Sequence, residues 1–312
     1  MRRAFGLWLL AIVCLWQQGA CAQAVLPGFP PGVFINRSAL DAAPVAGYQG
    51  PGDITSGAIA FYSCGRSYNA AYASGGGAAC TVVDTATGSV SCVLPLLSTG
   101  YVNTTACNST ACLIACSVSK MNDQTGNGND VVQATLANMP GLTFNAQNGL
   151  PCAAGTGNAA VRLATAGNVA QAAPFTLTAV TERTGSFTTV QKVLTNDTNT
   201  NPINFTASAN TLGVNNGTAV SLTAADSAFH ALLNVASGTA PLLAIDSSAN
   251  TSTSTNGTTA LTGPEYLMGR SSGAQALIAG FVCEAGIWPA DLNSSYQAML
   301  ANMRSATNGW NF

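Results

Sequence analysis

The chain has 312 residues, of which only 7% are charged, and its formal net charge is −2. Nucleic-acid binding requires clustered Lys and Arg that displace counterions, so a chain whose only lysines are Lys120 and Lys192 is a poor candidate for it. A surface built from Thr, Ser, Asn, Gly and Ala suits an extracellular protein that faces neutral glycans. Scarce Glu, Lys and Gln, with abundant Thr and Val, predict an all-β fold.

The first residues have the pattern of a secretory signal peptide. A pair of arginines precedes an apolar run at residues 7–16, and Ala20-Cys21-Ala22 supplies the small residues before a cleavage site. We expect cleavage after Ala22, with Ala24 as the alternative, so that residues 1–22 are removed. The apolar run is shorter than the roughly 20 residues of a spanning helix. The mature protein is therefore expected to be secreted, extracellular or periplasmic, with no membrane span.

Residues 23–52 are rich in Pro and Gly and are predicted to form an extended arm. Residues 53–312 are predicted to form a single β-sandwich domain, because short strand-like runs recur between Gly, Asn and Asp residues. The clearest runs are 81–84, 89–94, 113–119, 175–181, 229–236, 242–246, 266–269 and 278–287. We expect a short helix at 58–63 and a terminal amphipathic helix that opens at Ala290, with Asp291 as its N-cap.

Eight of the ten cysteines lie beyond residue 22. An even number in an exported chain indicates disulfides, and a single histidine, His230, argues against a zinc site. We expect a tight Cys107–Cys112 loop and a Cys80–Cys92 bridge across a hairpin. The remaining cysteines are paired provisionally as Cys64–Cys116 and Cys152–Cys283.

Several segments together resemble the catalytic domain of the α-L-arabinofuranosidase B family. The resemblance is sharpest over residues 59–133, where Cys107-Asn-Ser-Thr-Ala-Cys112 precedes a strand and the turn Asp123-Gln-Thr-Gly-Asn-Gly-Asn-Asp130. The segment 280–289 and the helix after it are also similar. The resemblance implies a concanavalin-like jelly roll of two stacked antiparallel sheets. The turn motif also occurs in laminin-G-like domains that are not known to hydrolyse anything, so it indicates a fold first.

The turn itself has two interpretations. Its glycines can adopt positive φ and its asparagines bond their own backbone, which makes a structural turn the favoured one. The alternative is a sugar or calcium site built from Asp123, Asn127, Asn129 and Asp130, since hard oxygen ligands suit calcium. Apart from that calcium, no cofactor or metal is expected.

The candidate catalytic residues are Asp226 and Glu182. A retaining glycosidase needs two carboxylates about 5–5.5 Å apart. The resemblance implies a nucleophile near residues 188–195, where the chain has Gln191 and no glutamate, and it implies an adjacent cysteine pair that the chain lacks. It also implies an acid/base aspartate close to Asp226. Glu182 follows a predicted strand and could point into a cleft or into solvent.

Other polar and aromatic residues have weaker interpretations. Glu284, within an apolar run, is either a buried structural acceptor or a site residue, and His230 is expected to be a strand residue without a catalytic role. Aromatic rings can stack on sugars. The candidates are Tyr68, Tyr72, Tyr101, Trp288 and Trp310, of which Trp288 is expected to be buried.

Three functions remain open. The first is an extracellular arabinofuranosidase, the second a glycan-binding or adhesion module that keeps the jelly roll without the chemistry, and the third a cell-surface structural domain. In each the partner is a neutral polysaccharide or glycan. Geometry distinguishes them, because hydrolysis requires two of the candidate carboxylates to converge in one pocket. Those candidates are Asp226, Glu182, Glu284 and Asp197.

Overall fold

The computed structural model describes residues 47–312, except for residues 90, 108–114, 157, 159, 186–188, 197–202, 217, 238–239, 253–259 and 271–278. The predicted signal peptide and most of the predicted arm lie outside this part. The described residues belong to one compact unit, residues 43–312. None of the helices in this part has the length and apolar character needed to span a bilayer.

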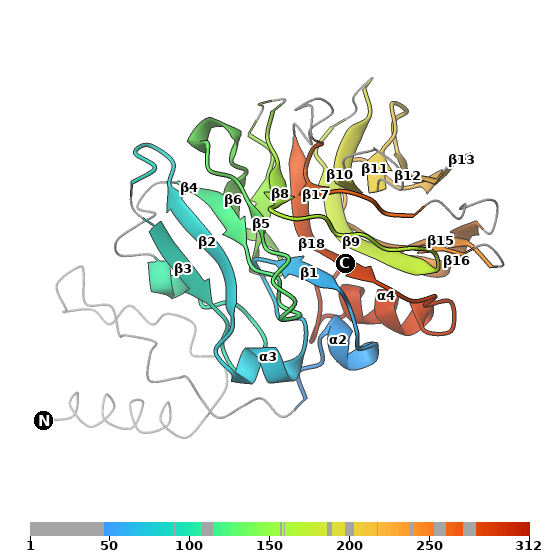
Figure 1. Cartoon of the computed structure of the whole chain (residues 1–312), viewed down its shortest axis with the longest axis horizontal. Coiled ribbons are helices and arrows are strands. Elements are labelled where there is room, and N and C mark those ends of the chain that lie inside the picture. Colours follow the sequence, from blue (N-terminus) through green and yellow to red (C-terminus); the bar gives the residue numbers. More distant parts are fainter. Residues whose placement is uncertain are drawn as a thin grey trace, which may run out of the picture. The chain divides into compact units, whose positions relative to one another are not determined.

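The first layer is a twisted antiparallel sheet in the order β3-β2-β4-β5-β8-β17-β10-β11-β12-β13 (Figure 1). Its strands are β2 (Ala78–Asp84), β3 (Ser91–Pro95), β4 (Cys116–Met121), β5 (Val131–Val132), β8 (Leu163–Thr165), β10 (Gln191–Asn196), β11 (Ile203–Phe205), β12 (Thr211–Asn216), β13 (Thr218–Thr223) and β17 (Glu265–Leu267). Strands distant in the sequence therefore become neighbours, as β17 does between β8 and β10.

The second layer runs in the order β16-β15-β14-β9-β18, and the far edge of β18 pairs with both β1 and β7. Its strands are β1 (Ala60–Ser63), β7 (Leu150–Ala154), β9 (Phe175–Arg183), β14 (His230–Ala236), β15 (Leu242–Ile245), β16 (Ser247–Ser252) and β18 (Gly280–Trp288). Strand β6 (Gly141–Gln147) pairs with β4 of the first layer and with β7 of the second, so it connects the two.

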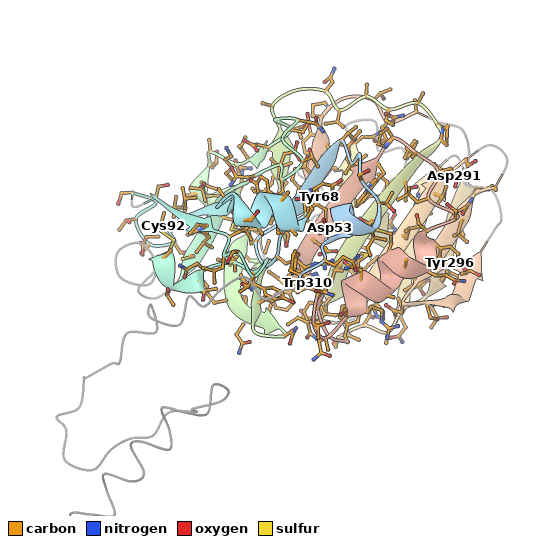
Figure 2. All side chains as sticks on the ribbon, turned by 90° about the horizontal axis from the view of Figure 1, so that it is seen from below. Asp53, Tyr68, Cys92, Asp291, Tyr296 and Trp310 are labelled. Carbon is orange, nitrogen blue, oxygen red and sulfur yellow. A yellow bond between two sulfur atoms is a disulfide. The ribbon has the colours of Figure 1, made fainter. Side chains whose placement is uncertain are left out.

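Two hydrophobic cores lie on the two faces of the second layer. Between the layers, Phe205 of β11 belongs to the same buried cluster as Leu177 of β9. On the other face, Val180 of β9 packs with Met299 and Met303 of helix α4 (Tyr296–Arg304). Strands β9 and β14 are buried along their whole length for this reason. Figure 2 views the molecule from the side on which α4 lies.

Shorter helices complete the fold. They are α2 (Pro51–Ile54), α3 (Ala70–Ser74) and the 3₁₀ turns η2 (Thr104–Cys107) and η3 (Leu136–Asn138). Helix α2 packs against α4. In Figure 2, Asp53 of α2 lies beside Tyr68. The Gly52 N–H of this helix donates to the Tyr68 carbonyl at 2.7 Å.

The all-β jelly roll with a terminal helix is confirmed, but two predicted helices need correction. Residues 58–63 are not a helix: β1 occupies Ala60–Ser63, and its four residues are all buried. A strand buried on both faces is continuously apolar and has no period that separates it from a helix. The terminal helix begins at Tyr296, and its N-cap position is Ser295 rather than Asp291. Asp291 instead accepts a hydrogen bond from the Asn293 N–H.

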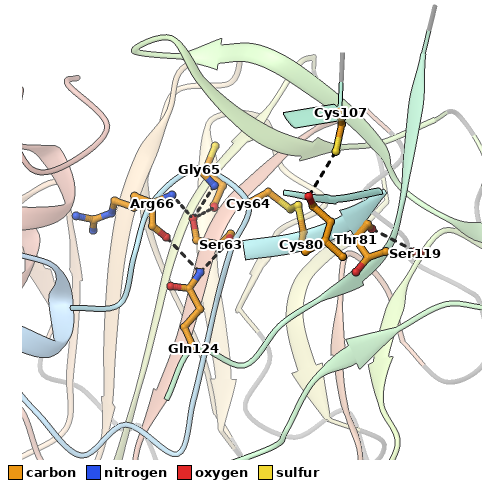
Figure 3. The surroundings of a disulfide bond; sticks show 11 residues. Ser63, Cys64, Gly65, Arg66, Cys80, Thr81, Cys107, Ser119 and Gln124 are labelled. Atoms are coloured by element: carbon orange, nitrogen blue, oxygen red, sulfur yellow. Dashed lines mark hydrogen bonds between the residues drawn. A yellow bond between two sulfur atoms is a disulfide. The ribbon is translucent and has the colours of Figure 1, made fainter. Parts of the chain in front are cut away.

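The predicted Cys152–Cys283 disulfide is confirmed and joins β7 to β18. The other three pairings are wrong, because Cys64 is bonded to Cys80 (Figure 3) and Cys92 to Cys107. Cys80 lies opposite Leu94 and Cys92 opposite Val82, so Cys80 and Cys92 are out of register across the hairpin. Cys116 is also disulfide-bonded, and Cys112 lies outside the described residues.

Candidate functional site

The Asp123 turn is held by backbone amides. The Asp123 carboxylate is almost buried, and its Oδ1 accepts from the N–H of Phe61 at 3.2 Å and of Thr125 at 3.0 Å. Its Oδ2 accepts from the Asn129 N–H at 3.0 Å. Asp130 in turn accepts from the Asp123 N–H at 2.8 Å. Both oxygens of Asp123 and one oxygen of Asp130 are therefore already engaged with amide donors.

The same motif attaches the turn to β1. Asn127 and Asn129 donate their side-chain amides to the Ile59 carbonyl, at 3.2 and 2.7 Å. Gln124 donates to the carbonyls of Ser63 and Arg66, as Figure 3 shows. Among the described residues, no group of three or more His, Cys, Asp or Glu side chains is arranged to hold a metal ion.

Asp226 lies against the fully buried Arg183 at the end of β9. Its Oδ1 accepts from the guanidinium Nε at 2.8 Å and lies 2.7 Å from Nη2, while its Oδ2 accepts from the Asn210 N–H at 3.1 Å. The remaining guanidinium N–H groups donate to the carbonyls of Thr206 and Ser208. Asp226 is thus the counter-ion of a cation that also fastens the segment between β11 and β12.

Glu182 precedes Arg183 in β9 and leaves the strand from the other face. Successive strand residues point to opposite faces of a sheet. Arg183 points to the inter-layer side, where it contacts the Phe205 ring at 4.9 Å. Glu182 lies opposite Phe281 of β18, on the face of Val180 that α4 covers. Burial raises the pKa of the Glu182 carboxyl. Asp226 therefore binds the residue that follows Glu182 in β9. The two carboxylates lie on opposite faces of that strand and do not face one another.

His230, at the start of β14, has a hydrogen-bond acceptor at each ring nitrogen. Nδ1 lies 2.6 Å from the Asp246 carboxylate and Nε2 lies 2.8 Å from the Ala225 carbonyl. An imidazole with two acceptors is satisfied only when both nitrogens carry protons. Burial opposes this charge, but the hydrogen bond to Asp246 and its charge raise the pKa of His230. His230 therefore links the loop before β14 to the turn after β15.

Glu284 is a buried acceptor in a second ion pair. Its two oxygens accept from Arg66 at 2.6 and 2.9 Å, and the Trp310 indole donates to it at 2.7 Å. Trp310, Trp288 and Tyr68 are all buried, so three of the five candidate aromatics lie inside the fold. Of the five, Tyr72 and Tyr101 are half-buried.

Gln191 and Lys192, in the segment where the resemblance implies a nucleophile, lie on opposite faces of β10. Gln191 faces Phe205 and is fully buried, and neither of its amide atoms has a hydrogen-bond partner among the described residues. Lys192 faces Asn204 on the outer side of the first layer. The structure thus places an uncharged amide inside the sandwich and an ammonium on its outer face. Sequence reasoning did not single out Lys192 as a site residue.

The outer face of the first layer carries a continuous row of side chains, here called the outer row. Its members lie opposite one another on successive strands: Val93, Thr81, Lys120, Val132, Ala164, Tyr266 and Thr195. Val93 and Val132 are 51% and 42% exposed. The row could not be predicted from the sequence, because its members come from seven strands that are aligned only by their pairing in the sheet.

Comparisons with known proteins agree with this architecture. No protein-family model and no curated protein matches the sequence. An arabinofuranosidase complexed with arabinofuranosyl-α-1,2-xylobiose superposes with a TM-score of 0.64 at 16% identity, over 83% of this chain and 65% of that one. A GH54 α-L-arabinofuranosidase soaked with a cyclic sulfate inhibitor superposes with a TM-score of 0.64 at 16% identity, over 83% of this chain and 66% of that one. A glutamate-to-glutamine variant of such an enzyme, soaked with 4-nitrophenyl α-L-arabinofuranoside, superposes with a TM-score of 0.63 at 15% identity, over 83% of this chain and 66% of that one.

The fold and the paired sheets define a jelly-roll β protein. At 15 to 16% identity the likeness concerns the fold, which is that of the α-L-arabinofuranosidase jelly roll. The chain spans 65 to 66% of the length of these structures.

Proposed function

We propose that the protein is a secreted, disulfide-stabilised jelly-roll module that recognises arabinofuranosyl-bearing polysaccharide without hydrolysing it. The observation that carries this proposal is the engagement of Asp226, whose two oxygens are bound by Arg183 and by the Asn210 N–H. A second candidate carboxylate, Glu182, leaves β9 from the opposite face. A retaining mechanism requires two carboxylates about 5–5.5 Å apart that can both reach one sugar. Because Glu182 leaves β9 from the face opposite to Arg183 and its counter-ion Asp226, these two carboxylates do not form such a pair, and Asp197 lies outside the described residues.

Recognition of a neutral glycan is supported by the chemistry of the outer row. Its exposed valines and the half-buried Tyr266 offer apolar surface to the C–H faces of sugar rings. Its half-buried Thr81 offers a hydroxyl group for hydrogen bonds. The row crosses the sheet from β3 to β10, which is an extended surface suited to a chain of sugars. The disulfides and the predicted signal peptide support export.

The test combines binding with hydrolysis. We expect the purified protein to be retarded in native gels that contain arabinan or arabinoxylan, and to release no 4-nitrophenol from 4-nitrophenyl α-L-arabinofuranoside above background. Val132→Asp should weaken retardation, since it charges the outer row. Ala298→Asp, at an exposed position of α4, adds the same charge elsewhere and should leave retardation unchanged. Equal retardation of these two variants would show that the outer row does not bind the polysaccharide.

A second candidate function, hydrolysis, is favoured by one observation. Burial raises the pKa of the Glu182 carboxyl, which is the direction in which the carboxyl of a general acid is tuned. In that case the protein would release 4-nitrophenol, and Glu182→Gln and Asp226→Asn would each abolish the release. Such a result would replace the binding proposal with the enzymatic one.

For the Asp123 turn, we propose a structural role rather than a calcium site. Its carboxylates already accept amide hydrogens, so added calcium and EDTA should leave the melting temperature unchanged. Asp123→Asn should lower it, because Phe61, Thr125 and Asn129 then lose a charged acceptor. A melting temperature that rises with calcium and falls with EDTA would support the metal site built from Asp123, Asn127, Asn129 and Asp130.

A further inference from the structure

The chain carries a modification motif that the proposed function does not use. In secreted proteins, N-linked oligosaccharides are attached to the asparagine of Asn-x-Ser/Thr, where x is not proline. The motif occurs at Asn36, Asn103, Asn108, Asn196, Asn204, Asn216, Asn250, Asn256 and Asn293. Residues 36, 108 and 256 lie outside the described part of the chain, as does the side chain of Asn216. A chain rich in Asn, Ser and Thr produces the motif by chance, so accessibility in the fold must distinguish the sites.

Burial argues against two of these asparagines. Asn196 of β10 is 0% exposed and Asn204 of β11 is 7% exposed. Asn196 lies opposite Glu265, and Asn204 lies opposite Lys192, and both of these partners are buried as well. An N-linked oligosaccharide is bulky and hydrated, so its attachment atom must reach the surface. Neither strand can carry one in the folded protein.

Two further asparagines already use the amide nitrogen that would be modified. The Asn293 Nδ2 group donates to the Ala240 carbonyl and, at 3.4 Å, to the Asp291 carboxylate. The Asn250 Nδ2 group donates to the Thr223 carbonyl at 3.0 Å. Attachment of a sugar replaces one of the two amide hydrogens. Asn293 would therefore lose a hydrogen bond, and Asn250 would keep its bond only through the remaining hydrogen.

Asn103, which follows β3, has the opposite arrangement. Asn103 is half-buried, and its backbone N–H donates to the Pro95 carbonyl at 2.8 Å. Its Oδ1 accepts from the N–H and the hydroxyl of the exposed Thr105, at 3.1 and 2.7 Å. Its Nδ2 has no acceptor among the described residues. The Cys92–Cys107 disulfide holds the following turn against β3. A sugar on Nδ2 would leave both hydrogen bonds to Oδ1 intact.

We propose that Asn103 is a site of N-linked glycosylation. The sugar donor is an oligosaccharide joined through N-acetylglucosamine to a lipid diphosphate. The Asn103 Nδ2 atom forms a bond to the anomeric carbon, the bond from that carbon to the diphosphate oxygen breaks, the lipid diphosphate leaves, and the amide gives up one proton. Thr105 supplies the hydroxyl of the motif and already contacts the Asn103 amide. The inference depends on the predicted export and not on glycan binding by the outer row.

The test measures the occupancy of each site in the full chain secreted by a eukaryotic host. Peptide N-glycosidase in heavy-oxygen water converts a glycosylated asparagine to labelled aspartate, and a digest without the enzyme corrects for spontaneous deamidation. Mass spectrometry of the peptides should find the label at Asn103 in most copies of the folded protein, and none at Asn196 or Asn204. An unlabelled Asn103 would overturn the proposal. Equal labelling of Asn103 and Asn204 would overturn the selection of the site by burial.

Variants of the motif hydroxyl provide matched controls. Thr105→Ala should abolish the label at Asn103 and raise mobility in denaturing gels, whereas Thr105→Ser keeps the hydroxyl and should keep the label. Thr206→Ala makes the same change in the motif of the buried Asn204 and should leave mobility unchanged. Unchanged mobility of Thr105→Ala would also overturn the proposal. Retardation by arabinan reports separately on the proposed function, so either can fail while the other stands.

Discussion

Arg66 and Glu284 form a bidentate ion pair in which neither side chain is exposed to solvent. The Arg66 Nε and Nη2 groups donate to the carboxylate at 2.6 and 2.9 Å. Trp310 donates to the same carboxylate, and Arg66 also donates to Asn302 of α4. The pair thereby connects the segment after β1, the strand β18, the helix α4 and the C-terminal residues in one buried network.

The first prediction concerns this pair. Glu284→Gln should lower the free energy of unfolding by about 3–5 kcal/mol, because it leaves the buried guanidinium uncompensated. Urea unfolding followed by tryptophan fluorescence measures the loss. Asp84→Asn, at the partly exposed end of β2, is the control and should cost far less. The double variant Arg66→Met/Glu284→Leu should recover much of the loss, since it removes both charges. Equal losses in Glu284→Gln and Asp84→Asn would contradict the buried-pair account.

The second prediction concerns the counter-ion of Arg183. Asp226→Asn should destabilise the fold by about 1.5–3 kcal/mol, the range for hydrogen bonds to charged groups. It should also speed amide hydrogen exchange in residues 206–210, which Arg183 and Asp226 fasten to β9. Asn293→Ala, beyond β18, serves as a distant control for exchange in this segment. A variant of unchanged stability and exchange would show that Asp226 is not a structural counter-ion.

The third prediction is a pH dependence set by His230. Because its pKa is raised in the folded protein, its stabilising contribution is complete below the ordinary value and is lost as the pH rises through the folded value. Asp246 and Glu182 supply the negative charges around it, and Arg304 donates to the Asp246 carbonyl. As the pH rises above the ordinary value of 6.5, stability should therefore fall more steeply in the wild type than in His230→Gln. Parallel pH profiles for the two proteins would contradict this.

The fourth prediction concerns Glu265, a buried carboxyl whose Oε1 has no hydrogen-bond partner among the described residues. Burial raises its pKa well above the ordinary value. As the pH rises above the ordinary carboxyl value, the unfolded chain therefore ionises at Glu265 more readily than the folded protein, which lowers the stability of the native state. Glu265→Gln should thus gain stability relative to wild type as the pH rises from 4 to 7.

The control for Glu265 is Asp84→Asn, which should change in the opposite direction. Hydrogen bonds from Thr87 hold the pKa of Asp84 below its ordinary value, so its contribution is present at neutral pH and lost in acid. Urea titrations at pH 4, 5.5 and 7 compare both variants with the wild type. A stability difference between Glu265→Gln and wild type that is flat with pH would contradict the raised pKa of Glu265.

The fifth prediction compares two disulfides. Cys152–Cys283 closes a separation of 131 residues and Cys92–Cys107 one of 15. In the chain-entropy model the longer loop contributes about 2 kcal/mol more, because it restricts the unfolded chain more strongly. Replacing Cys152 and Cys283 with alanine should therefore lower the free energy of unfolding more than replacing Cys92 and Cys107. Equal losses would indicate that contacts in the native state, and not loop closure, decide the contribution.

The elements that the sequence predicts correctly have local causes. The run at 175–181 alternates apolar and polar residues and becomes β9, and the apolar run at 278–287 becomes β18. Gly126 and Gly128 adopt φ of +85° and +79°, which glycine tolerates because it lacks a Cβ. These features follow from backbone preferences that neighbouring residues determine. The jelly roll could be expected from them together with the family resemblance.

What the tertiary structure alone decided is which distant residues meet. The pairing of Cys64 with Cys80, the engagement of Asp226 by Arg183 and the ion pair of Arg66 with Glu284 depend on strand register and on the face from which each side chain leaves its sheet. A shift of one residue exchanges the two faces of a strand, so a list of carboxylates in a sequence does not reveal which of them can share a pocket. The sequence by itself therefore determined the local elements and the scarcity of charge, and it predicts an export signal. The composition of the site is a property of the assembled sheets, because only their pairing brings its residues together.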